Sequence, residues 1–212
     1  MTVIMATVGF TAAKVHPVLH TEDAKEELVL FFDKDSPDNK GRSKAAAKEL
    51  AAYAAKLGME VRLIEVSAFD LVESCLQVRR EIRKRAGKDI VLSIAGGTRV
   101  LSSAALLASI LEGVRVVHIS ERDNAVQPLP LLKLEAGAVL NEEKRRVLRH
   151  VRATPGCRQS DLVQALGISK GTVSHHVQGL ARQGLLEQVP DEDDSRSKRL
   201  RAVASADLLL ME

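Results

Sequence analysis

The chain has 212 residues, of which 45% are hydrophobic, 28% are charged and 2% are aromatic, and its formal net charge is +3. This length suits one medium domain and one small domain, and so small a net charge does not by itself indicate a nucleic-acid binder. The low aromatic content disfavours a single-strand binder built on base stacking, and the sequence has no apolar run of about eighteen residues that would predict a membrane span.

Cysteine usage and the N-terminal sequence indicate the compartment. Cys75 and Cys157 fall in separate predicted domains, which argues against a disulfide framework and for a reducing environment. The N-terminal stretch lacks the basic region and cleavage site of a secretory signal, so we interpret it as a first strand. We therefore expect a cytoplasmic protein with no membrane partner.

Residues 1–124 alternate between strand and helix patterns. The predicted strands are rich in Val, Ile and Leu, as is typical of strands buried on both faces. They are Thr2–Val8, Leu28–Phe32, Val61–Val66, Ile90–Ile94 and Val114–Ile119. The predicted helices are Ala12–Asp23, Arg42–Leu57, Ala68–Arg85 and Val100–Leu111. This repetition predicts an α/β domain with an open, mostly parallel sheet and helices on both faces.

In such sheets ligands bind beyond the carboxyl ends of the strands, so the loops that leave the strands are the candidate site. The loop after the second strand, Asp33–Gly41, is long and polar. The other loops supply the candidate ligand-binding residues, which are Gly9, Phe10, Thr11, Ser67, Gly96, Gly97, Thr98 and Arg99.

The loop after the fourth strand carries the strongest pattern. Gly96 and Gly97 allow the backbone to approach an anion, and the following helix points N–H groups at the same place. Thr98 adds a hydroxyl, and Arg99 adds a charged fork that suits phosphate. This is neither a dinucleotide fingerprint nor a P-loop. The alternative is that the two glycines only make a tight turn.

Residues 125–140 are predicted to link this domain to a second one. Their first part, Ala125–Leu134, is apolar and punctuated by prolines. That composition is more typical of a packed strand or arm than of a loose tether.

Residues 141–212 predict a second, smaller domain, a winged helix-turn-helix. Asn141 is predicted to cap a first helix over Glu142–Val151. In the stretch Asp161–Leu180, Gly167 suits a turn with positive φ, and Ser169 suits a helix cap. Leu162, Leu166 and Ile168 are predicted to supply apolar contacts from the first helix and the turn. Val173, Val177 and Leu180 recur at helical spacing and are predicted to form the buried stripe of the second helix.

The opposite face of the second helix in this stretch carries small or hydrogen-bonding side chains, as expected of a helix in a DNA major groove. These side chains belong to Ser169, Lys170, Gly171, Thr172, Ser174, His175 and Gln178. The alternative is a helical hairpin, or a protein-interaction module, that binds no nucleic acid.

A hairpin follows this helix after Gly184. The predicted strands are Leu185–Val189 and Leu200–Val203, around a polar tip over Pro190–Arg199. Arg196, Lys198 and Arg199 are predicted to reach DNA phosphates or the minor groove. The acidic run Asp191–Asp194 is expected to face solvent or to pair with the basic residues. This wing resembles that of multiple-antibiotic-resistance-type repressors.

Three features together resemble the CRISPR-associated transcription regulators with a CARF (CRISPR-associated Rossmann fold) sensor domain. These are Val8-Gly9-Phe10-Thr11, Gly96-Gly97-Thr98-Arg99 and the C-terminal winged helix. The resemblance implies a Rossmann-like sensor domain, binding of double-stranded DNA, and a homodimer. It also implies a cyclic oligoadenylate, in particular cyclic tetra-adenylate, bound across the two-fold axis between the two motifs.

Two other functions stay open. A ring nuclease would cleave the bound cyclic oligoadenylate, with Thr11, Lys14, Ser67 and Arg99 positioning its phosphates. A repressor could instead sense another phosphorylated metabolite. We expect no enzyme, because no catalytic triad or Cys-His couple stands out. We also expect no metal or cofactor, because His16 and His20 lack a third ligand nearby.

Overall fold

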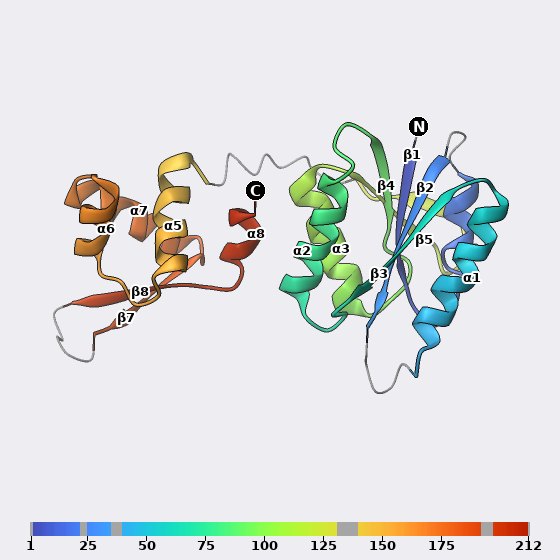
Figure 1. Ribbon diagram of the computed structural model, residues 1–212, viewed down its shortest axis with the longest axis horizontal. Coiled ribbons are helices and arrows are strands. Elements are labelled where there is room, and N and C mark those ends of the chain that lie inside the picture. The colour runs from blue at the N-terminus through green and yellow to red at the C-terminus, as the bar shows by residue number, and fades with distance from the viewer. Residues whose placement is uncertain (1, 22–24, 35–39, 131–139, 192–196, 212) are drawn as a thin grey trace. The chain divides into compact units, whose positions relative to one another are not determined.

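The computed structural model describes all residues except 1, 22–24, 35–39, 131–139, 192–196 and 212. It consists of two compact units, Met1–Leu134 and Glu135–Glu212 (Figure 1). No helix in the described part of the chain is long and apolar enough to cross a membrane.

The first unit is built on a six-stranded sheet with the order β3-β2-β1-β4-β5-β6. The strands are β1 Thr2–Val8, β2 Lys25–Asp33, β3 Glu60–Val66, β4 Asp89–Ser93, β5 Arg115–Ile119 and β6 Val126–Pro128. The first five are parallel, and β6 pairs antiparallel with β5. All five predicted strands are confirmed. The prediction of an open, mostly parallel sheet is also confirmed.

Helices cover both faces of this sheet. They are the 3₁₀ helix η1 His16–His20, α1 Arg42–Lys56, α2 Leu71–Arg83 and α3 Arg99–Glu112. Helix α1 lies against one face, whereas α2 and α3 pack together on the other (Figure 1). Leu50 of α1 is fully buried with Leu28 and Leu30 of β2 in the core on its side of the sheet.

Two of the predicted helices begin or run differently. The predicted helix Ala12–Asp23 is wrong, because within its described residues only η1 forms, with Pro17 in its first turn. Proline lacks the amide hydrogen and clashes with the preceding turn, so an α-helix cannot run through it from Ala12. Helix α2 begins at Leu71 and not at Ala68, because the Asp70 side chain caps it by accepting from the Glu73 amide at 3.0 Å. Phe69 therefore lies in the loop before α2.

The predicted linker of residues 125–140 begins inside the first unit. Val126–Pro128 forms the edge strand β6, and the Leu129 amide donates to the Val116 carbonyl at 2.9 Å. The packed strand that the composition indicated is therefore present at this edge. Residues 131–139 lie outside the described part of the chain.

The second unit is a helical domain with a two-stranded antiparallel hairpin. Its elements are α5 Glu142–Ala153, α6 Gln159–Leu166, α7 Lys170–Arg182, β7 Leu186–Pro190, β8 Lys198–Ala202 and α8 Ala206–Leu210. Asn141 caps α5, and Gly167 ends α6 with a φ of 66°, as predicted. The winged helix-turn-helix is thus confirmed. Strand β8 begins two residues earlier than predicted, so Lys198 and Arg199 belong to it and not to the tip.

Both cysteines are free and buried, one in each unit. Burial raises the pKa of the Cys75 thiol to about 11, and burial also raises the pKa of the Cys157 thiol. Because the thiolate is the reactive form, we expect the native protein to react slowly with a thiol reagent at about pH 8, and the unfolded protein to react fast at both sites. A Ser103→Cys variant, exposed on α3, is the control that should react fast in the native state. Fast native labelling of Cys75 would contradict its burial.

Candidate functional site

A cavity of about 320 Å³ lies where β1, β2 and β4 end. Its walls are Val8, Gly9, Phe10, Asp33, Ser43, Phe69, Gly97 and Thr98. The strand order reverses between β1 and β4, and ligands of such sheets bind in the crevice at this reversal. A second cavity of about 230 Å³, beside β5 and β6, contains none of the predicted site residues. The first cavity is therefore the candidate ligand site.

The loops after β1 and β4 touch through their glycines. A Cβ atom on Gly96 would lie 2.5 Å from the Thr7 carbonyl oxygen and 2.9 Å from the Gly9 amide nitrogen. A Cβ atom on Gly9 would lie 2.9 Å from the Gly97 nitrogen, and Gly97 has a φ of +87°. No larger residue fits such contacts without displacing backbone. The glycines are thus required for packing of the two loops, which the tight-turn alternative explains only in part.

Thr98 has a structural role at this edge of the sheet. Its hydroxyl accepts from the Leu101 amide at 3.0 Å, which caps α3, and donates to the Ala68 carbonyl at 2.6 Å. One side chain therefore holds the loop after β3 against the loop after β4. Ser102 adds a hydrogen bond to the Gly96 carbonyl at 2.9 Å. The amino end of the 14-residue helix α3 is thereby held beside the cavity.

The predicted ligand-binding residues divide into two groups. Gly9, Phe10, Gly97 and Thr98 line the cavity. Thr11, Ser67, Gly96 and Arg99 do not line it, although the first three lie on the loops around it and Arg99 directly follows one of these loops. Arg99 is the first residue of α3 and is exposed, and it makes no ion pair among the described residues. It is thus available to a ligand that extends out of the cavity.

Four cavity residues were not among the predicted site residues. Val8 is the last residue of β1. Asp33 ends β2, so the rule that ligands lie beyond strand ends would have found it, although the prediction treated its loop only as long and polar. Phe69 was assigned to a helix that in fact starts at Leu71. Ser43 lies in the first turn of α1, and only the fold brings that turn to the cavity.

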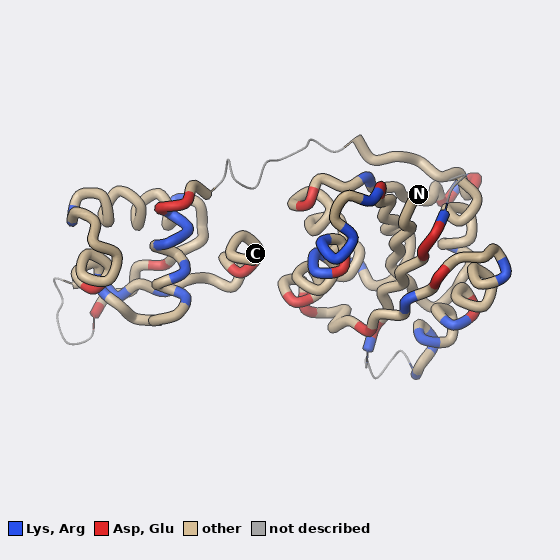
Figure 2. The backbone as a smooth tube through the Cα atoms, turned by 45° about the horizontal axis from the view of Figure 1, so that its top comes forward, with Lys and Arg blue, Asp and Glu red and all other residues tan. Residues whose placement is uncertain are grey.

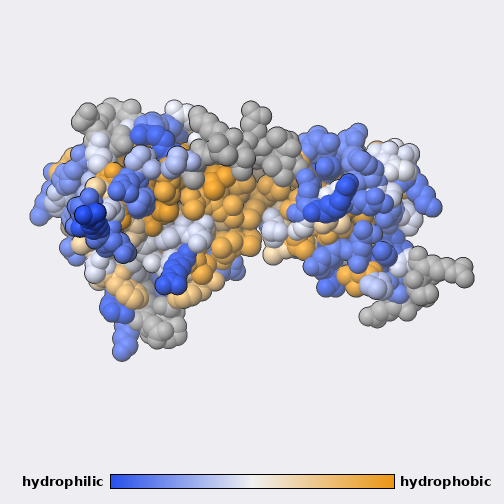
Figure 3. All heavy atoms as spheres, turned by 180° about the vertical axis from the view of Figure 1, so that it is seen from behind, coloured by the Kyte–Doolittle hydropathy of each residue, from blue (hydrophilic) through white to orange (hydrophobic). Residues whose placement is uncertain are grey.

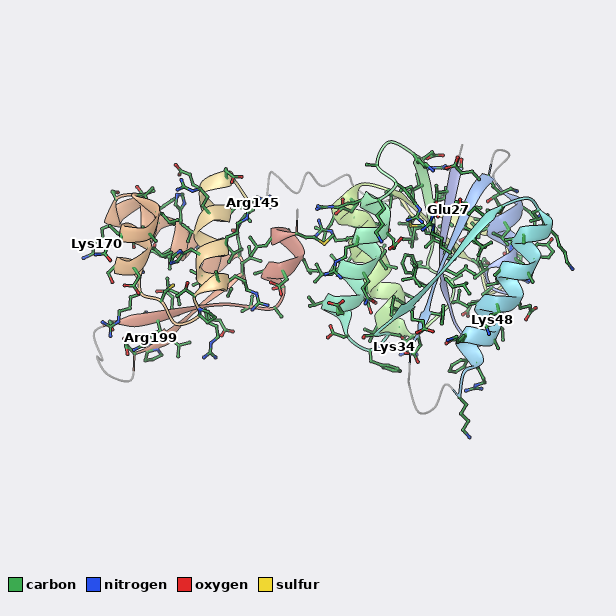
Figure 4. The ribbon with its side chains drawn as sticks, viewed as in Figure 1. Glu27, Lys34, Lys48, Arg145, Lys170 and Arg199 are labelled. Carbon is green, nitrogen blue, oxygen red and sulfur yellow. The ribbon has the colours of Figure 1, made fainter. Side chains whose placement is uncertain are left out.

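Helix α7 has two chemically distinct faces. Val173, Val177 and Leu180 are fully buried in the core of the second unit. The predicted DNA-binding residues of this helix and its cap are exposed or half-buried, and they are Ser169, Lys170, Gly171, Thr172, Ser174, His175 and Gln178. The Lys170 side chain extends away from the helix (Figure 4). The Ser169 hydroxyl accepts from the Thr172 amide at 3.1 Å, so its capping role is confirmed.

His176 holds α7 against α5. The side chain is buried, and its Nε2 lies 3.0 Å from the Glu143 carboxylate. It thus supports the helix from the side opposite to exposed His175. Lys and Arg positions are dense along α5 (Figure 2). Five of them lie within Lys144–Arg152.

A buried carboxylate holds the base of the wing. The Asp191 side chain is fully buried, with its oxygens 2.6 Å from Nη2 of Arg158 and 2.9 Å from Nε of Arg199. The Ser197 hydroxyl also donates to it, at 3.0 Å. Of the two predicted environments for the acidic run, pairing with basic residues is the correct one for Asp191. Lys198 is exposed, whereas Arg196 lies outside the described residues.

About a third of the chain is similar to parts of several solved proteins. These include the S. aureus MepR–DNA complex, with 27% identity over 34% of this chain and 59% of that chain and a TM-score of 0.32. PcaV from Streptomyces coelicolor shows 28% identity over 33% and 50%, with a TM-score of 0.32. Streptococcus pneumoniae FabT in complex with DNA shows 22% identity over 34% and 50%, with a TM-score of 0.33. The match thus spans half to three fifths of each of these proteins. No curated protein matches the chain.

Family models match both units. Residues 140–197 match the MarR family, in agreement with the winged helix-turn-helix of the second unit. Residues 2–129, more than half of the chain, match the Csa3 CRISPR-associated Rossmann-like domain. The resemblance to CRISPR-associated regulators is therefore confirmed, and the chain belongs to the family of the Csa3 CRISPR-associated Rossmann-like domain.

Proposed function

We propose that the protein is a transcription regulator that binds double-stranded DNA through its winged helix and senses a cyclic oligoadenylate, in particular cyclic tetra-adenylate, through its first unit. The observation that carries the proposal is the joining of two sites in one chain. These are a cavity at the strand-order reversal of a CRISPR-associated Rossmann-like domain and a recognition helix of the MarR type.

The chemistry of α7 supports DNA binding. Its exposed side chains are small, hydroxyl-bearing, amide or basic, so the helix can approach base edges closely and hydrogen-bond to them. Lys170 at its amino end and Lys198 on β8 are exposed cations that suit phosphates on either side of the groove.

The edge formed by the loops after β1 and β4 supports binding of a phosphorylated ligand. Helix α3 directs its amino end, with its positive partial charge, to this edge, and Arg99 adds a full charge. Helix amino ends and arginine forks are favourable phosphate-binding groups. The cavity beside them has room for part of a nucleotide, since ligand cavities begin at roughly 300 Å³.

A homodimer would suit the binding of both the cyclic ligand and DNA. Cyclic tetra-adenylate can adopt two-fold symmetry, so two copies of one loop can each hold half of it. Two recognition helices would read half-sites about 34 Å apart. Apolar side chains gather on one face of the first unit (Figure 3). Val100, Leu107 and Ile110 of α3 are only half-buried. Such a face suits contact with a second copy.

Isothermal titration of the full chain with cyclic tetra-adenylate tests the sensing function. We expect saturable binding at one ligand per dimer, and a change in the affinity for operator DNA when the ligand is present. Chromatography of the ligand after incubation checks for cleavage, and linear products would identify a ring nuclease. If no cyclic oligoadenylate binds, the proposed sensing function is wrong. The alternative of a repressor that senses another phosphorylated metabolite then stands.

Substitutions should separate the two activities. His175→Ala should weaken DNA binding by about 1–3 kcal/mol, and Lys170→Ala should reduce the slope of log affinity against log salt by about one. Neither should change ligand affinity. Arg99→Ala should weaken ligand binding roughly tenfold or more and leave unliganded DNA binding intact. Gel-shift and titration assays measure these effects.

Arg182→Ala is the matched control for Lys170→Ala. It removes the same charge from the far end of the same exposed helix surface, away from the amino-terminal residues that reach base edges. Its effect on DNA affinity should be clearly smaller. Equal loss of both activities in all variants would show unfolding and not separate sites.

A further inference from the structure

Two of the four phenylalanines lie at the candidate ligand site and are exposed. Phe31 and Phe32 are buried in β2, whereas Phe10 and Phe69 line the cavity with 51% and 65% of their surface exposed. When a ligand covers a large apolar side chain that water had surrounded, the free energy of the system falls. Two planar rings in the wall of one cavity therefore favour a planar, stacking ligand group.

Phe10 is held in place from one side. The guanidinium of Arg42, the first residue of α1, lies 3.9 Å from the centroid of the Phe10 ring. This cation–π contact orients the ring in advance of ligand binding. Phe69 lies in the loop held by the hydrogen bond from Thr98 to the adjacent Ala68 carbonyl. Both rings are thus carried by loops that the fold fixes at the same edge of the sheet.

A carboxylate completes the cavity wall. Asp33 ends β2, is only 8% exposed and lines the cavity beside Ser43. A carboxylate has about four lone-pair positions, so Asp33 can accept a hydrogen bond from a ligand in addition to its contacts within the protein. An ionised carboxylate only accepts hydrogen bonds. It therefore favours a ring with an amine at its edge and disfavours a ring with a carbonyl there.

We propose that Phe10, Phe69 and Asp33 form an aminopurine pocket, in which the two rings stack on one base and the Asp33 carboxylate accepts from its exocyclic amine. This inference rests on the proposed sensing function, because the base would belong to a nucleotide whose phosphate lies at the amino end of α3. It assigns base selectivity to Asp33 and binding strength to Phe69, whereas Arg99 and the glycine loops recognise only the backbone of the ligand.

Titration of the full chain with two ligands tests the pocket. Cyclic tetra-inosinate replaces the exocyclic amine of each adenine with a carbonyl, so the wild-type protein should bind it at least about tenfold more weakly than cyclic tetra-adenylate. Asp33→Asn, which keeps the shape and adds a donor, should reduce this ratio towards one. Phe69→Ala should weaken binding of both ligands about tenfold, and Phe69→Tyr should restore it.

Leu63→Ala is the matched control for Phe69→Ala. Leu63 is an exposed apolar side chain of the same unit, on the edge strand β3 and outside the cavity, and its removal should leave both affinities unchanged. Equal affinities for Phe69→Ala and Leu63→Ala would overturn the pocket while the sensing function stands. So would a wild-type protein that does not distinguish the two ligands.

A mononucleotide separates the pocket from the sensing function. If cyclic tetra-adenylate does not bind, saturation-transfer NMR with adenosine monophosphate still tests the cavity. Binding that is lost in Phe69→Ala and kept in Leu63→Ala would support the pocket and reject only the cyclic ligand. If adenosine monophosphate does not bind the wild-type protein either, both the pocket and the sensing function are wrong.

Discussion

Gly96→Ala is expected to lower the free energy of unfolding of the first unit by about 3 kcal/mol and to abolish ligand binding. The added Cβ would lie 2.5 Å from the Thr7 carbonyl oxygen and 2.9 Å from the Gly9 amide nitrogen. Both neighbours are backbone atoms of β1 or of the residue just after it, and β1 is buried along its whole length. They cannot move without shifting the central strand, so the loops after β1 and β4 must separate.

Tyrosine fluorescence isolates this effect. The chain has one tyrosine and no tryptophan, and Tyr53 lies in α1, so urea unfolding followed by tyrosine emission reports on the first unit alone. Gly113→Ala is the matched control. Gly113 has a φ of 69° with no atom within 4 Å of its Cβ position, so it tests the backbone conformation without the clash and should cost only about 1 kcal/mol. Equal losses for the two variants would rule out the clash.

The core of the fold could be predicted because hydrophobic continuity marks strands that are buried on both faces. In β1 all seven residues are buried, and the sequence Thr2–Val8 has the same limits as the strand. The 3.6-residue spacing in α7 was equally clear, since its buried positions Val173, Val177 and Leu180 fill the second core. In both cases a local pattern is enough, because each element buries one continuous surface.

The errors have tertiary or local causes. Pro17 prevents the helix predicted after β1, because proline lacks the amide hydrogen and clashes with the preceding turn of an α-helix. The limits of the edge strand β6 within the apolar stretch 125–134 could not be predicted, because its three residues are too few to show a period. Neither error altered the position of the site.

The candidate ligand site was only half predictable. Glycine patterns pointed to the loops after β1 and β4, but the contact between Gly9 and Gly97 depends on these strands being neighbours in the sheet. Asp33 and Phe69 join them only because β2 and β3 end at the same edge. A sequence pattern shows which residue follows a strand, whereas strand order decides which of those residues share a cavity.

Asp191→Ala is expected to release the wing and to weaken DNA binding about tenfold, with ligand affinity unchanged. The substitution removes a buried carboxylate and leaves Arg158 and Arg199 without the partner that joins α6 to β8. Loss of a fully buried partner costs several kcal/mol, but these two arginine side chains are 40% and 43% exposed. Water can therefore solvate them, and we expect a local cost of about 2 kcal/mol.

Hydrogen exchange measures this local cost, because amides of β7 and β8 should exchange faster by a factor of roughly 30 if the hairpin opens more easily by that amount. Glu187→Ala is the matched control, since Glu187 is an exposed carboxylate on β7 of the same hairpin. Glu187→Ala removes the same charge and should change neither the DNA affinity nor the exchange rates of the β7 and β8 amides. Weaker DNA binding in both variants would mean that the loss of either hairpin side chain is enough, and that the buried carboxylate has no special role. Faster exchange with weaker DNA binding in Asp191→Ala only would show that this carboxylate positions the wing, and with it Lys198, for the DNA backbone.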